Sequence, residues 1–311
     1  MIEVEEARVF AGGVRWLAGA MTVACAMLVG PSAPRDALVG GALPADAVRE
    51  VVPHRVMTWN LCNPCEESNV DRAAEIAAYA PQVVGFQEAC ASDVARIRNE
   101  LERRYGLVYH VAYGTVLQDW GRCGGVPWSP DGYGQALLSA GPITGRINVE
   151  YPDGGSEDRG YMAITTSVGG RSVRVFNTHL AERRQESVRA DQIGVLAAEV
   201  ARHDRAIVLG DFNAVPDAPE LAPMWALAVD TDPQCHPAPA DGCQTTTDWH
   251  SKFDYVFLRG VTALDHHVQP SAYSDHHMLD TDLDVTRGVA PTAGTAGTAG
   301  TAGTAGTASK R

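Results

Sequence analysis

Polar side chains that can bind a metal ion or transfer a proton stand at the ends of several apolar segments of the chain. Asn60 closes RVMTWN, Glu88 follows VVGFQ and His179 closes RVFNTH. Asp211 and Asn213 follow AIVLG, and since they are two residues apart in an extended segment they point to the same side. The ends of neighbouring strands are where α/β sheets assemble a site from separated parts of the sequence. The pattern therefore predicts that these five side chains share one site.

Each of these residues also has a structural interpretation when it is taken alone. Asn60 and Asn213 are common turn formers, and Asp211 could cap a loop. Glu88 could cap the helix that follows it, and His179 could be a half-buried histidine whose hydrogen bonds are satisfied. The recurrence of such residues at successive strand ends favours the functional interpretation.

Short apolar strands alternate with helical segments along most of the chain, which is typical of the α/β class. The expected strands are residues 55–60, 83–87, 136–139, 161–168, 171–178, 206–210 and 253–258. The expected helices are residues 69–80, 92–104, where Ser92 can act as the cap, and 182–202, where Arg183 to Arg189 are expected on a solvated face. No long linker interrupts residues 51–286, so we expect one domain there.

Six short motifs, VMTWN, GFQE, NTHL, GDFN, FDYVF and SDHH, occur in an order that resembles the endonuclease/exonuclease/phosphatase superfamily. The resemblance covers residues 55 to about 284, and GDFN followed by a late SDH is its most specific part. It implies a four-layer α/β sandwich of two packed mixed β-sheets flanked by α-helices. It also implies the activity of a metal-dependent phosphoester hydrolase.

The resemblance also implies a role for each matched residue. It makes Glu88 the principal metal ligand, with Asn60 beside it to hold the metal or the phosphate, and Asp275 a further carboxylate of the metal site. It makes Asp211 and Asn213 the pair that orients the attacking water and the phosphate oxygens.

The proton-transfer groups are assigned on the same basis. The resemblance makes His276 the general base and Asp254 the carboxylate that holds its imidazole ring, although Asp254 could instead pair with Lys252. It makes His179 the histidine that binds the phosphoryl oxygen and can help to protonate the leaving group. Arg159 stands where relatives place an arginine against the phosphate.

These residue types suit the hydrolysis of a phosphodiester. The phosphodiester is an anion that repels hydroxide, so a cation must neutralise its oxygens, and a histidine can take the proton of the attacking water. Carboxylate and amide oxygens are hard ligands, which favour Mg²⁺ over zinc and also allow Mn²⁺. We therefore expect Mg²⁺ as the cofactor.

Six of the seven cysteines follow residue 51, and an even set in an exported chain predicts up to three disulfides. They are Cys62, Cys65, Cys90, Cys123, Cys235 and Cys243. Cys235 and Cys243 flank a proline-rich loop and are the best pair, whereas the partners of the other four stay open. Cys62 and Cys65 form a C-x-x-C that could also bind zinc, but one such pair is weak support for a zinc site.

The two ends of the chain differ from the central domain. Residues 16–29 are an uncharged apolar run, too short to span a bilayer and typical of a signal-peptide core. The glutamates before this run are unusual for a signal peptide, and translation from Val14 would remove them. We expect residues 1–50 to be a signal-peptide region with a flexible segment, and the protein to be secreted. Residues 287–311 carry Thr-Ala-Gly repeats with nothing to bury, which predicts a disordered tail.

The net charge of −13 argues against tight binding of nucleic acid by a basic surface alone, but not against a phosphate contacted through a metal ion. The leading hypothesis is a secreted, monomeric phosphodiesterase whose substrate is nucleic acid rather than lipid, with no stable protein partner. The alternatives are a lipid phosphodiesterase or phosphatase of the sphingomyelinase or phosphoinositide type, and a non-catalytic binding module. Residues 118–134, with Trp120, Trp128 and Tyr133, could stack bases, enter a lipid interface or be structural.

Overall fold

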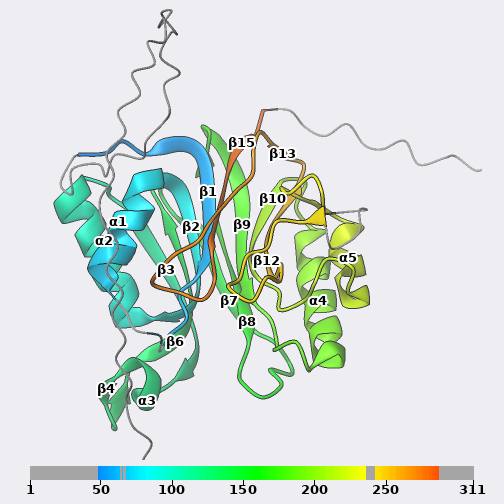
Figure 1. Ribbon diagram of the computed structural model, residues 1–311, viewed down its shortest axis with the longest axis horizontal. Helices are drawn as coiled ribbons and strands as arrows, with labels where there is room; N and C mark the ends of the chain where they lie inside the picture. The colour runs from blue at the N-terminus through cyan, green and yellow to red at the C-terminus, as the bar shows by residue number, and fades with distance from the viewer. Residues whose placement is uncertain (1–47, 64, 66–67, 236–241, 287–311) are drawn as a thin grey trace, which may run out of the picture. The chain divides into compact units, whose positions relative to one another are not determined.

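The computed structural model describes residues 48–63, 65, 68–235 and 242–286. The predicted signal-peptide region up to residue 47 and the predicted tail lie outside these residues. In the described part of the chain, no helix is both long and apolar enough to cross a membrane. The described elements build two β-sheets that face each other, with helices on their outer sides (Figure 1).

The first sheet combines the amino-terminal strands of the domain with its last ones. Its order is β13-β15-β1-β2-β6-β3, and β14 pairs with β15. β1 and β2 are parallel, whereas β15 is antiparallel to β1, and β6 is antiparallel to β2 and β3. The strands are β1 (Val52–Asn60), β2 (Pro81–Cys90), β3 (His110–Gln118), β6 (Gly132–Ser139), β13 (Thr262–Ala263), β14 (His267–Gln269) and β15 (Met278–Asp284).

The second sheet has the order β11-β12-β10-β9-β8-β7. β9 and β10 are parallel, and β12 is antiparallel to β10. The strands are β7 (Thr144–Glu150), β8 (Gly160–Val168), β9 (Arg171–His179), β10 (Ala206–Asp211), β11 (Val229–Asp230) and β12 (Asp254–Arg259). A separate hairpin pairs β4 (Gly125–Val126) with β5 (Ser129–Pro130).

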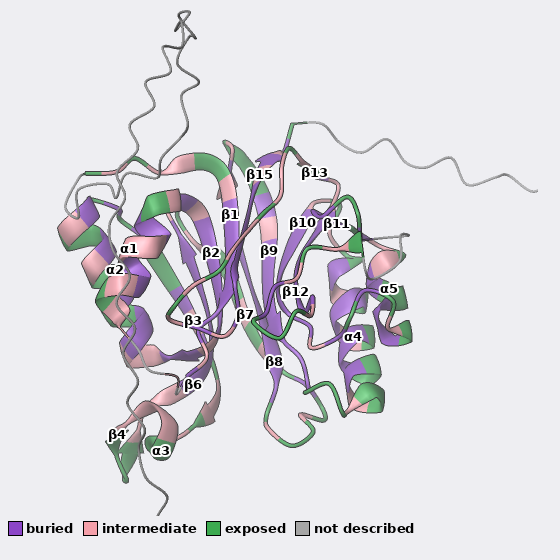
Figure 2. Cartoon of the chain, in the orientation of Figure 1, coloured by how far each residue is buried: buried purple, intermediate pink, exposed green. Residues whose placement is uncertain are grey.

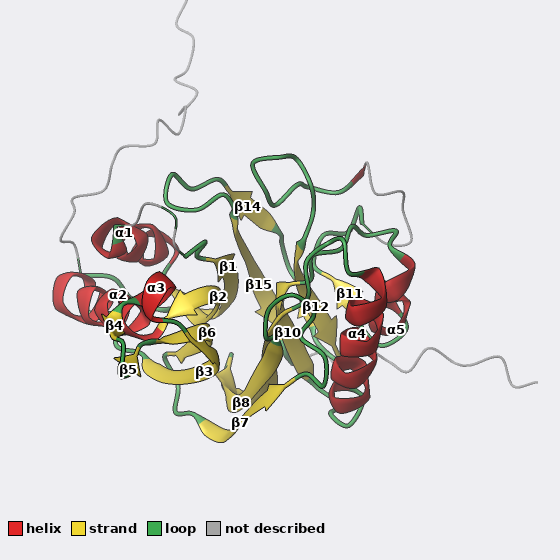
Figure 3. Ribbon diagram, turned by 90° about the horizontal axis from the view of Figure 1, so that it is seen from below, coloured by secondary structure: helices red, strands yellow, loops and turns green. Residues whose placement is uncertain are grey.

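The helices lie on the outer faces of the two sheets, as the view in Figure 3 makes plain. Ser68 caps the first helix by accepting a hydrogen bond from the amide of Asp71 (3.2 Å), and Pro81 begins the next strand. The helical segments are α1 (Asn69–Tyr79), α2 (Ala91–Tyr105), α3 (Trp120–Cys123), α4 (Glu186–Val200), the short 3₁₀ turn Pro219–Leu221 and α5 (Ala222–Trp225).

Buried apolar side chains form three layers, which appear as the purple inner parts of the elements in Figure 2. Trp59, Phe86 and Leu101 belong to the layer between the first sheet and its helices. The two sheets pack on each other through a layer that includes Val56, Val83, Ile164, Val175 and Leu209. Phe176, Leu196 and Phe257 belong to the layer between the second sheet and α4. The four-layer α/β sandwich is therefore confirmed.

Every strand and helix expected from the sequence is present, with ends that differ by up to four residues. The strands that the sequence did not indicate include β3, β7 and β15. In β15, Asp280 and Asp282 interrupt the apolar pattern, because Arg55 on the neighbouring strand pairs with this acidic edge (Arg55 Nε to Asp282 Oδ1, 2.7 Å).

Two local expectations were wrong. Ser92 does not cap α2, because the helix begins at Ala91 and the amide of Ser92 donates instead to Asp131 Oδ2 (2.9 Å). Arg189 does not lie on a solvated face with Arg183 and Arg184. It turns inward on α4 and pairs with Glu220 (Nη2 to Oε1, 2.6 Å), and both side chains are buried.

Replacing Arg189 with alanine is expected to destabilise the domain by about 3–5 kcal/mol, because Glu220 would be left as a buried charge without its partner. The measurement is the free energy of unfolding in urea. The exposed Arg184→Ala is the matched control and should change this free energy by less than about 0.5 kcal/mol. Equal stability of the two variants would contradict the importance of this buried pair.

Candidate active site

The polar strand ends meet where the two sheets face each other. Asn60 ends β1 and pairs in register with Gln87, the residue before Glu88, on parallel β2. Asp211 ends β10 and lies opposite His179 at the end of parallel β9. Asn60, Glu88, Asp211 and His179 lie together with Asn213, so the five residues expected at strand ends form one cluster.

Two carboxylates are joined by an amide at the centre of this cluster. Asn60 Nδ2 lies 3.3 Å from Glu88 Oε1 and 3.0 Å from Asp211 Oδ2, and it donates to both. The amide of Cys62 donates to Asn60 Oδ1 (2.9 Å), which fixes the orientation of the Asn60 side chain. Asn60 thus presents its nitrogen rather than its oxygen to the carboxylates.

Burial raises the pKa of Glu88 above its ordinary value, with the Arg159 cation and the Asn60 hydrogen bond acting against it. Burial also raises the pKa of Asp211 to about 7, although the nearby His276 cation lowers it. Among the described residues, no lysine or arginine forms an ion pair with either carboxylate. Two converging carboxylates that lack such a partner are hard oxygen ligands with unbalanced charge, so the residues fit a divalent cation such as Mg²⁺.

Glu88 reaches this position because β2 is irregular there. The register between β2 and β6 shifts between Phe86 and Ala89, and Glu88 has a φ of 48°. A bulge redirects a side chain at a strand end, and a left-handed backbone is strained for a non-glycine residue. Asn213 has a similar φ of 49°, and its amide donates to Asp211 Oδ1 (2.8 Å).

His276 and Asp254 form a buried hydrogen-bonded pair. His276 Nδ1 donates to Asp254 Oδ2 (2.8 Å), and Nε2 lies 3.7 Å from Asp211 Oδ2. Burial alone would lower the pKa of His276, but the charges of Asp254 and then Asp211 raise it to about 10. Lys252 pairs with Asp230 (2.9 Å), so the alternative role for Asp254 as its partner is not realised.

Three residues that sequence reasoning did not single out support this pair. Thr246 donates through Oγ1 to Asp254 Oδ2 (2.7 Å), and Ser274 Oγ accepts from the amide of His276 (3.0 Å). Trp249 meets the His276 ring edge to face, with centroids 5.3 Å apart. Thr246 and Trp249 lie in a loop without a recognisable motif, whereas Ser274 directly precedes Asp275 and could have been found there.

Arg159 and His179 form a second hydrogen-bonded pair, which also lies next to Asp211. Arg159 Nη1 lies 2.6 Å from His179 Nδ1, and His179 Nε2 lies 3.5 Å from Asp211 Oδ2 and 3.8 Å from Glu88 Oε1. Burial, followed by the positive charge of Arg159, lowers the pKa of His179 well below its ordinary value. The ring is therefore neutral, so that one of its nitrogens donates a hydrogen bond and the other accepts one.

Asp275 lies apart from the two joined carboxylates. Its carboxylate oxygen is within 4.8 Å of the sulfur atoms of Cys62 and Cys65, and no contact in the described part of the chain joins it to Glu88. The backbone carbonyl of Asp275 accepts from the amide of Asp248 (3.0 Å). A role for Asp275 in the metal site stays a prediction, and the geometry favours Asp211 as the partner of Glu88.

The six cysteines form three pairs. Cys235 pairs with Cys243, as expected, and the four others pair as Cys62–Cys65 and Cys90–Cys123. The Cys62–Cys65 pair follows Asn60 directly. The Cys90–Cys123 pair joins the end of β2, next to Glu88, to the segment that contains α3. Two of the three disulfides therefore attach loops to the ends of the strands that carry site residues.

A polar layer beneath the site connects the two sheets. Gln87 Nε2 donates to Thr58 Oγ1 (3.0 Å) on β1 and to Asn177 Oδ1 (2.6 Å) on β9. Asn177 Nδ2 in turn donates to the carbonyl of Phe86 (2.8 Å). All of these groups are buried, so their hydrogen bonds fix the separation of the two strand ends that carry Glu88 and His179.

Removal of one carboxylate should change the ionisation of His276 measurably. In the metal-free protein, Asp254→Asn is expected to lower the pKa of His276 from about 10 toward its ordinary value, because Asp254 is the strongest of the interactions that raise it. Nitrogen-15 NMR of the histidine rings measures this titration. Asp248→Asn, which contacts His277 instead, is the control. An unchanged titration in Asp254→Asn would contradict the assigned pairing.

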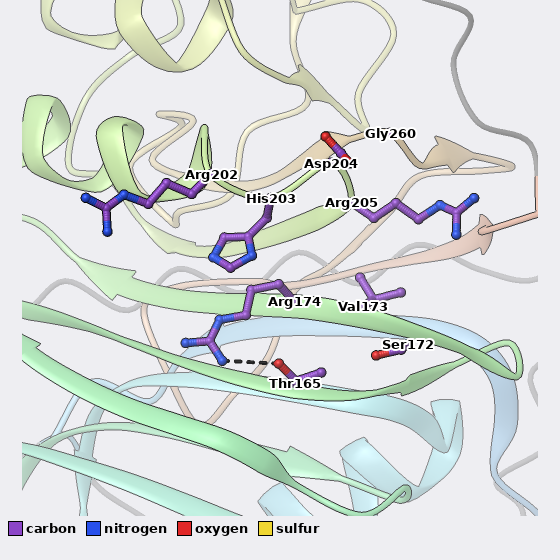
Figure 4. Close-up of a pocket in the computed structure, with 9 residues that line it drawn as sticks. All are labelled: Thr165, Ser172, Val173, Arg174, Arg202, His203, Asp204, Arg205 and Gly260. Carbon is purple, nitrogen blue, oxygen red and sulfur yellow. Dashed lines mark hydrogen bonds between the residues drawn. The ribbon is translucent and has the colours of Figure 1, made fainter.

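Two of the concave surfaces differ in where they lie relative to the site. One of about 500 Å³ adjoins the site and is lined by Glu182, Arg183, Asn213, Trp249, Ser251 and Phe253. The other, of about 650 Å³, includes Arg174, Arg202, His203 and Arg205 (Figure 4). Arg174 and Arg205 lie near the start of β9 and β10, whereas the site residues lie at the ends of these strands. The basic concavity is therefore separate from the candidate site.

Residues 57–276 match the model of the Endonuclease/Exonuclease/phosphatase family. The chain therefore belongs to this family, whose members are metal-dependent phosphoester hydrolases, and it is an enzyme of this type. A search of curated proteins found no match.

Solved structures show the same fold. An endonuclease/exonuclease/phosphatase from Beutenbergia cavernae is 24% identical, with a TM-score of 0.59, over 74% of this chain and 70% of that one. The catalytic domain of human Nocturnin with a bound sulfate anion is 21% identical, with a TM-score of 0.59, over 76% and 96% of the two chains. D. rerio TDP2 in complex with a single-strand DNA product is 18% identical, with a TM-score of 0.58, over 74% and 98%.

Proposed function

We propose that this phosphoester hydrolase is a secreted, monomeric, Mg²⁺-dependent phosphodiesterase whose substrate is nucleic acid. The observation that supports the hydrolytic part is that Asp211 lies between two histidines whose pKa values are shifted in opposite directions. His276, paired with Asp254, is basic, whereas His179, paired with Arg159, is neutral. Once His276 has released its own proton, it can take a proton from water, while His179 donates a hydrogen bond to a phosphate oxygen.

The geometry of the site gives each residue a different role in hydrolysis. Asp211 Oδ2 lies 3.7 Å from His276 Nε2, a separation that a reacting water can bridge by donating to both groups. His276 takes the proton at Nε2 because its Nδ1 is bonded to Asp254, and that carboxylate stabilises the resulting imidazolium. Arg159 and a ring N–H of His179 hold the phosphoryl oxygens beside this water. Asn213, whose Nδ2 lies 3.2 Å from His179 Nε2, keeps that ring in place.

Glu88 and Asp211 are the residues that would hold the cation, and Asn60 fixes their separation. When bound, a divalent cation neutralises the phosphate oxygens and weakens the negative field that keeps His276 protonated.

Three features support nucleic acid as the substrate. A structurally similar protein, TDP2, has been solved with a single-strand DNA product. Trp249, which is 43% exposed, lines the concavity beside the site, where an aromatic ring can stack on a base. Trp120 is 55% exposed on the segment that the Cys90–Cys123 disulfide ties to the end of β2.

A lipid substrate is the second candidate, and one observation favours it. Trp128 is 84% exposed in the hairpin β4–β5, and Val126 beside it is also exposed. Residues 124–130, GGVPWSP, carry no charge, which is typical of a tip that enters a lipid interface.

Export is proposed from the cysteines and the amino-terminal sequence together. Three disulfides persist in an oxidising environment, and the apolar run at residues 16–29 is typical of a signal peptide.

A substrate panel tests the proposal. Purified protein with Mg²⁺ is incubated with single-stranded DNA, plasmid, RNA, sphingomyelin vesicles, phosphoinositide vesicles and a soluble bis-phosphodiester, with His276→Asn as the blank. Cleavage of nucleic acid is expected, and excess EDTA should abolish it. Product from lipid alone would overturn the proposed substrate. Inactivity of the wild type on every member of the panel would overturn the hydrolase and favour a binding module.

A further inference from the structure

We propose that Arg122 is a positioning residue for Arg159 and His179, that it acts through Glu157, and that the Cys90–Cys123 disulfide holds it in place. This inference rests on the proposed phosphodiesterase activity, because it concerns the residues that receive the phosphate. Arg122 itself lies on α3, outside the cluster of strand ends that forms the site.

An unbroken chain of ionic and hydrogen-bonding contacts connects Arg122 to the site. Arg122 Nη1 lies 2.5 Å from Glu157 Oε2, and the other oxygen of that carboxylate, Oε1, lies 2.9 Å from Arg159 Nη1. Arg159 Nη1 in turn lies 2.6 Å from His179 Nδ1. The two oxygens of Glu157 are thus shared between two guanidinium groups, and a shift of one group is transmitted to the other.

Arg122 is held on three sides. Its guanidinium stacks on the ring of Tyr133, with Cζ 4.3 Å from the centroid, and its amide donates to Asp119 Oδ1 (3.0 Å). The neighbouring Cys123 forms the disulfide with Cys90. Tyr133 on β6 and Cys90 on β2 are paired in register, and Cys90 lies two residues after Glu88. These contacts therefore fix Arg122 relative to the strand end that carries Glu88.

Arg159 needs this support because a second carboxylate acts on it. Arg159 is buried, and its positive charge also acts on Glu88, whose carboxylate can compete with Glu157 for the guanidinium. Glu157 holds Arg159 through its own ion pair with it (2.9 Å). Glu157 is itself only partly buried and precedes Arg159 in a segment without regular structure, so the ion pair with Arg122 is what fixes its carboxylate from outside the site. Small displacements of a group that contacts the reacting phosphate reduce the rate strongly.

Steady-state kinetics on the preferred phosphodiester test this role. Arg122→Ala is expected to lower kcat by about tenfold with a change in KM below about threefold, since the phosphate is still bound but is poorly aligned. Arg122→Lys should restore most of kcat, because a lysine can still pair with Glu157, although with one donor at a time. Arg96→Ala is the matched control, since Arg96 lines one concavity with Arg122 but pairs with Asp93, and among the described residues no ion pair or hydrogen bond joins it to Glu157, Arg159 or His179.

A double-mutant cycle tests the path. Arg122→Ala and Glu157→Gln remove the same ion pair, so the double variant should lose no more kcat than the worse single variant. The Cys90→Ser, Cys123→Ser protein should lose kcat in the same way, with Arg122→Ala adding little. Circular dichroism and the melting temperature verify that each variant is folded.

The outcomes separate this inference from the proposed function. A cleaving wild type whose Arg122→Ala variant retains wild-type kcat, or is not rescued by lysine, overturns the positioning role and leaves the phosphodiesterase intact. A wild type that cleaves nothing overturns the proposed function. In that case, nitrogen-15 NMR of the His179 ring still tests the contacts: a ring signal that changes in Arg122→Ala and not in Arg96→Ala supports the chain to Arg159, and an unchanged signal in both variants overturns it.

Discussion

Replacement of His276 by asparagine is expected to lower kcat by about 10²–10⁴-fold, the range that a positioned proton-transfer group contributes. Its Nε2 faces Asp211 at 3.7 Å while Nδ1 is bonded to Asp254, so no other group in the described site combines a basic nitrogen with this direction. Asparagine preserves a polar side chain that can still meet Asp254 but cannot accept a proton. Single-turnover kinetics at saturating metal measures the effect on the chemical step.

His277→Asn is the matched control because it changes the same residue type one position along the chain. His277 pairs with Asp248 (3.1 Å) and not with the site, so kcat should stay within about threefold of the wild type. A loss in His277→Asn as large as the loss in His276→Asn would show that the segment, rather than the imidazole of His276, matters. Unchanged kcat in His276→Asn would contradict its assignment as the base.

Replacement of Glu88 by glutamine is expected to weaken Mg²⁺ binding by at least about 100-fold and to lower kcat by about 10³-fold. Glutamine keeps the shape and the contact with Asn60 but removes one of the two negative charges that would hold the cation. Calorimetric titration with Mg²⁺ or Mn²⁺ measures the binding separately from activity, and the rise in melting temperature with added metal gives a second measure.

Glu75→Gln is the control for this change. Glu75 is a partly buried carboxylate on α1 that accepts a hydrogen bond from Ser271 (2.7 Å), so its loss should leave the metal affinity unchanged. If Glu88→Gln binds the metal as tightly as the wild type, the carboxylates at the ends of β2 and β10 do not form the metal site. Asp275 beside Cys62 and Cys65 would then be the next position to examine.

The sequence was most informative where local patterns coincide with long-range geometry. Asp211 and Asn213 follow an apolar strand, and β10 does run through the core with Asp211 at its end. A glycine precedes them for a physical reason: a Cβ at Gly210 would collide with the carbonyl of Thr178 on the neighbouring strand. The GDFN motif therefore reflects both the position of two site residues and the close approach of β9 and β10.

Features that depend on separate segments could not be predicted. Glu157 has no motif, and its role emerges only because α3 brings Arg122 to it across 35 residues. Arg189 was expected in solvent because a run of arginines on a helix is usually solvated, but the buried Glu220 reverses that preference. The pairing of Cys90 with Cys123 likewise follows from the path of the chain between β3 and β6, which spacing alone does not reveal.

Cleavage of a phosphodiester in water enriched with oxygen-18 tests the central claim most directly, because that claim is attack of a water molecule on phosphorus with His276 as the base. Mass spectrometry of the products should find one oxygen-18 atom in the phosphate and none in the released alcohol, and His276→Asn should give no such product at the wild-type rate. Label in the alcohol, a product without label, or no cleavage of any phosphodiester in the presence of Mg²⁺ would contradict the account.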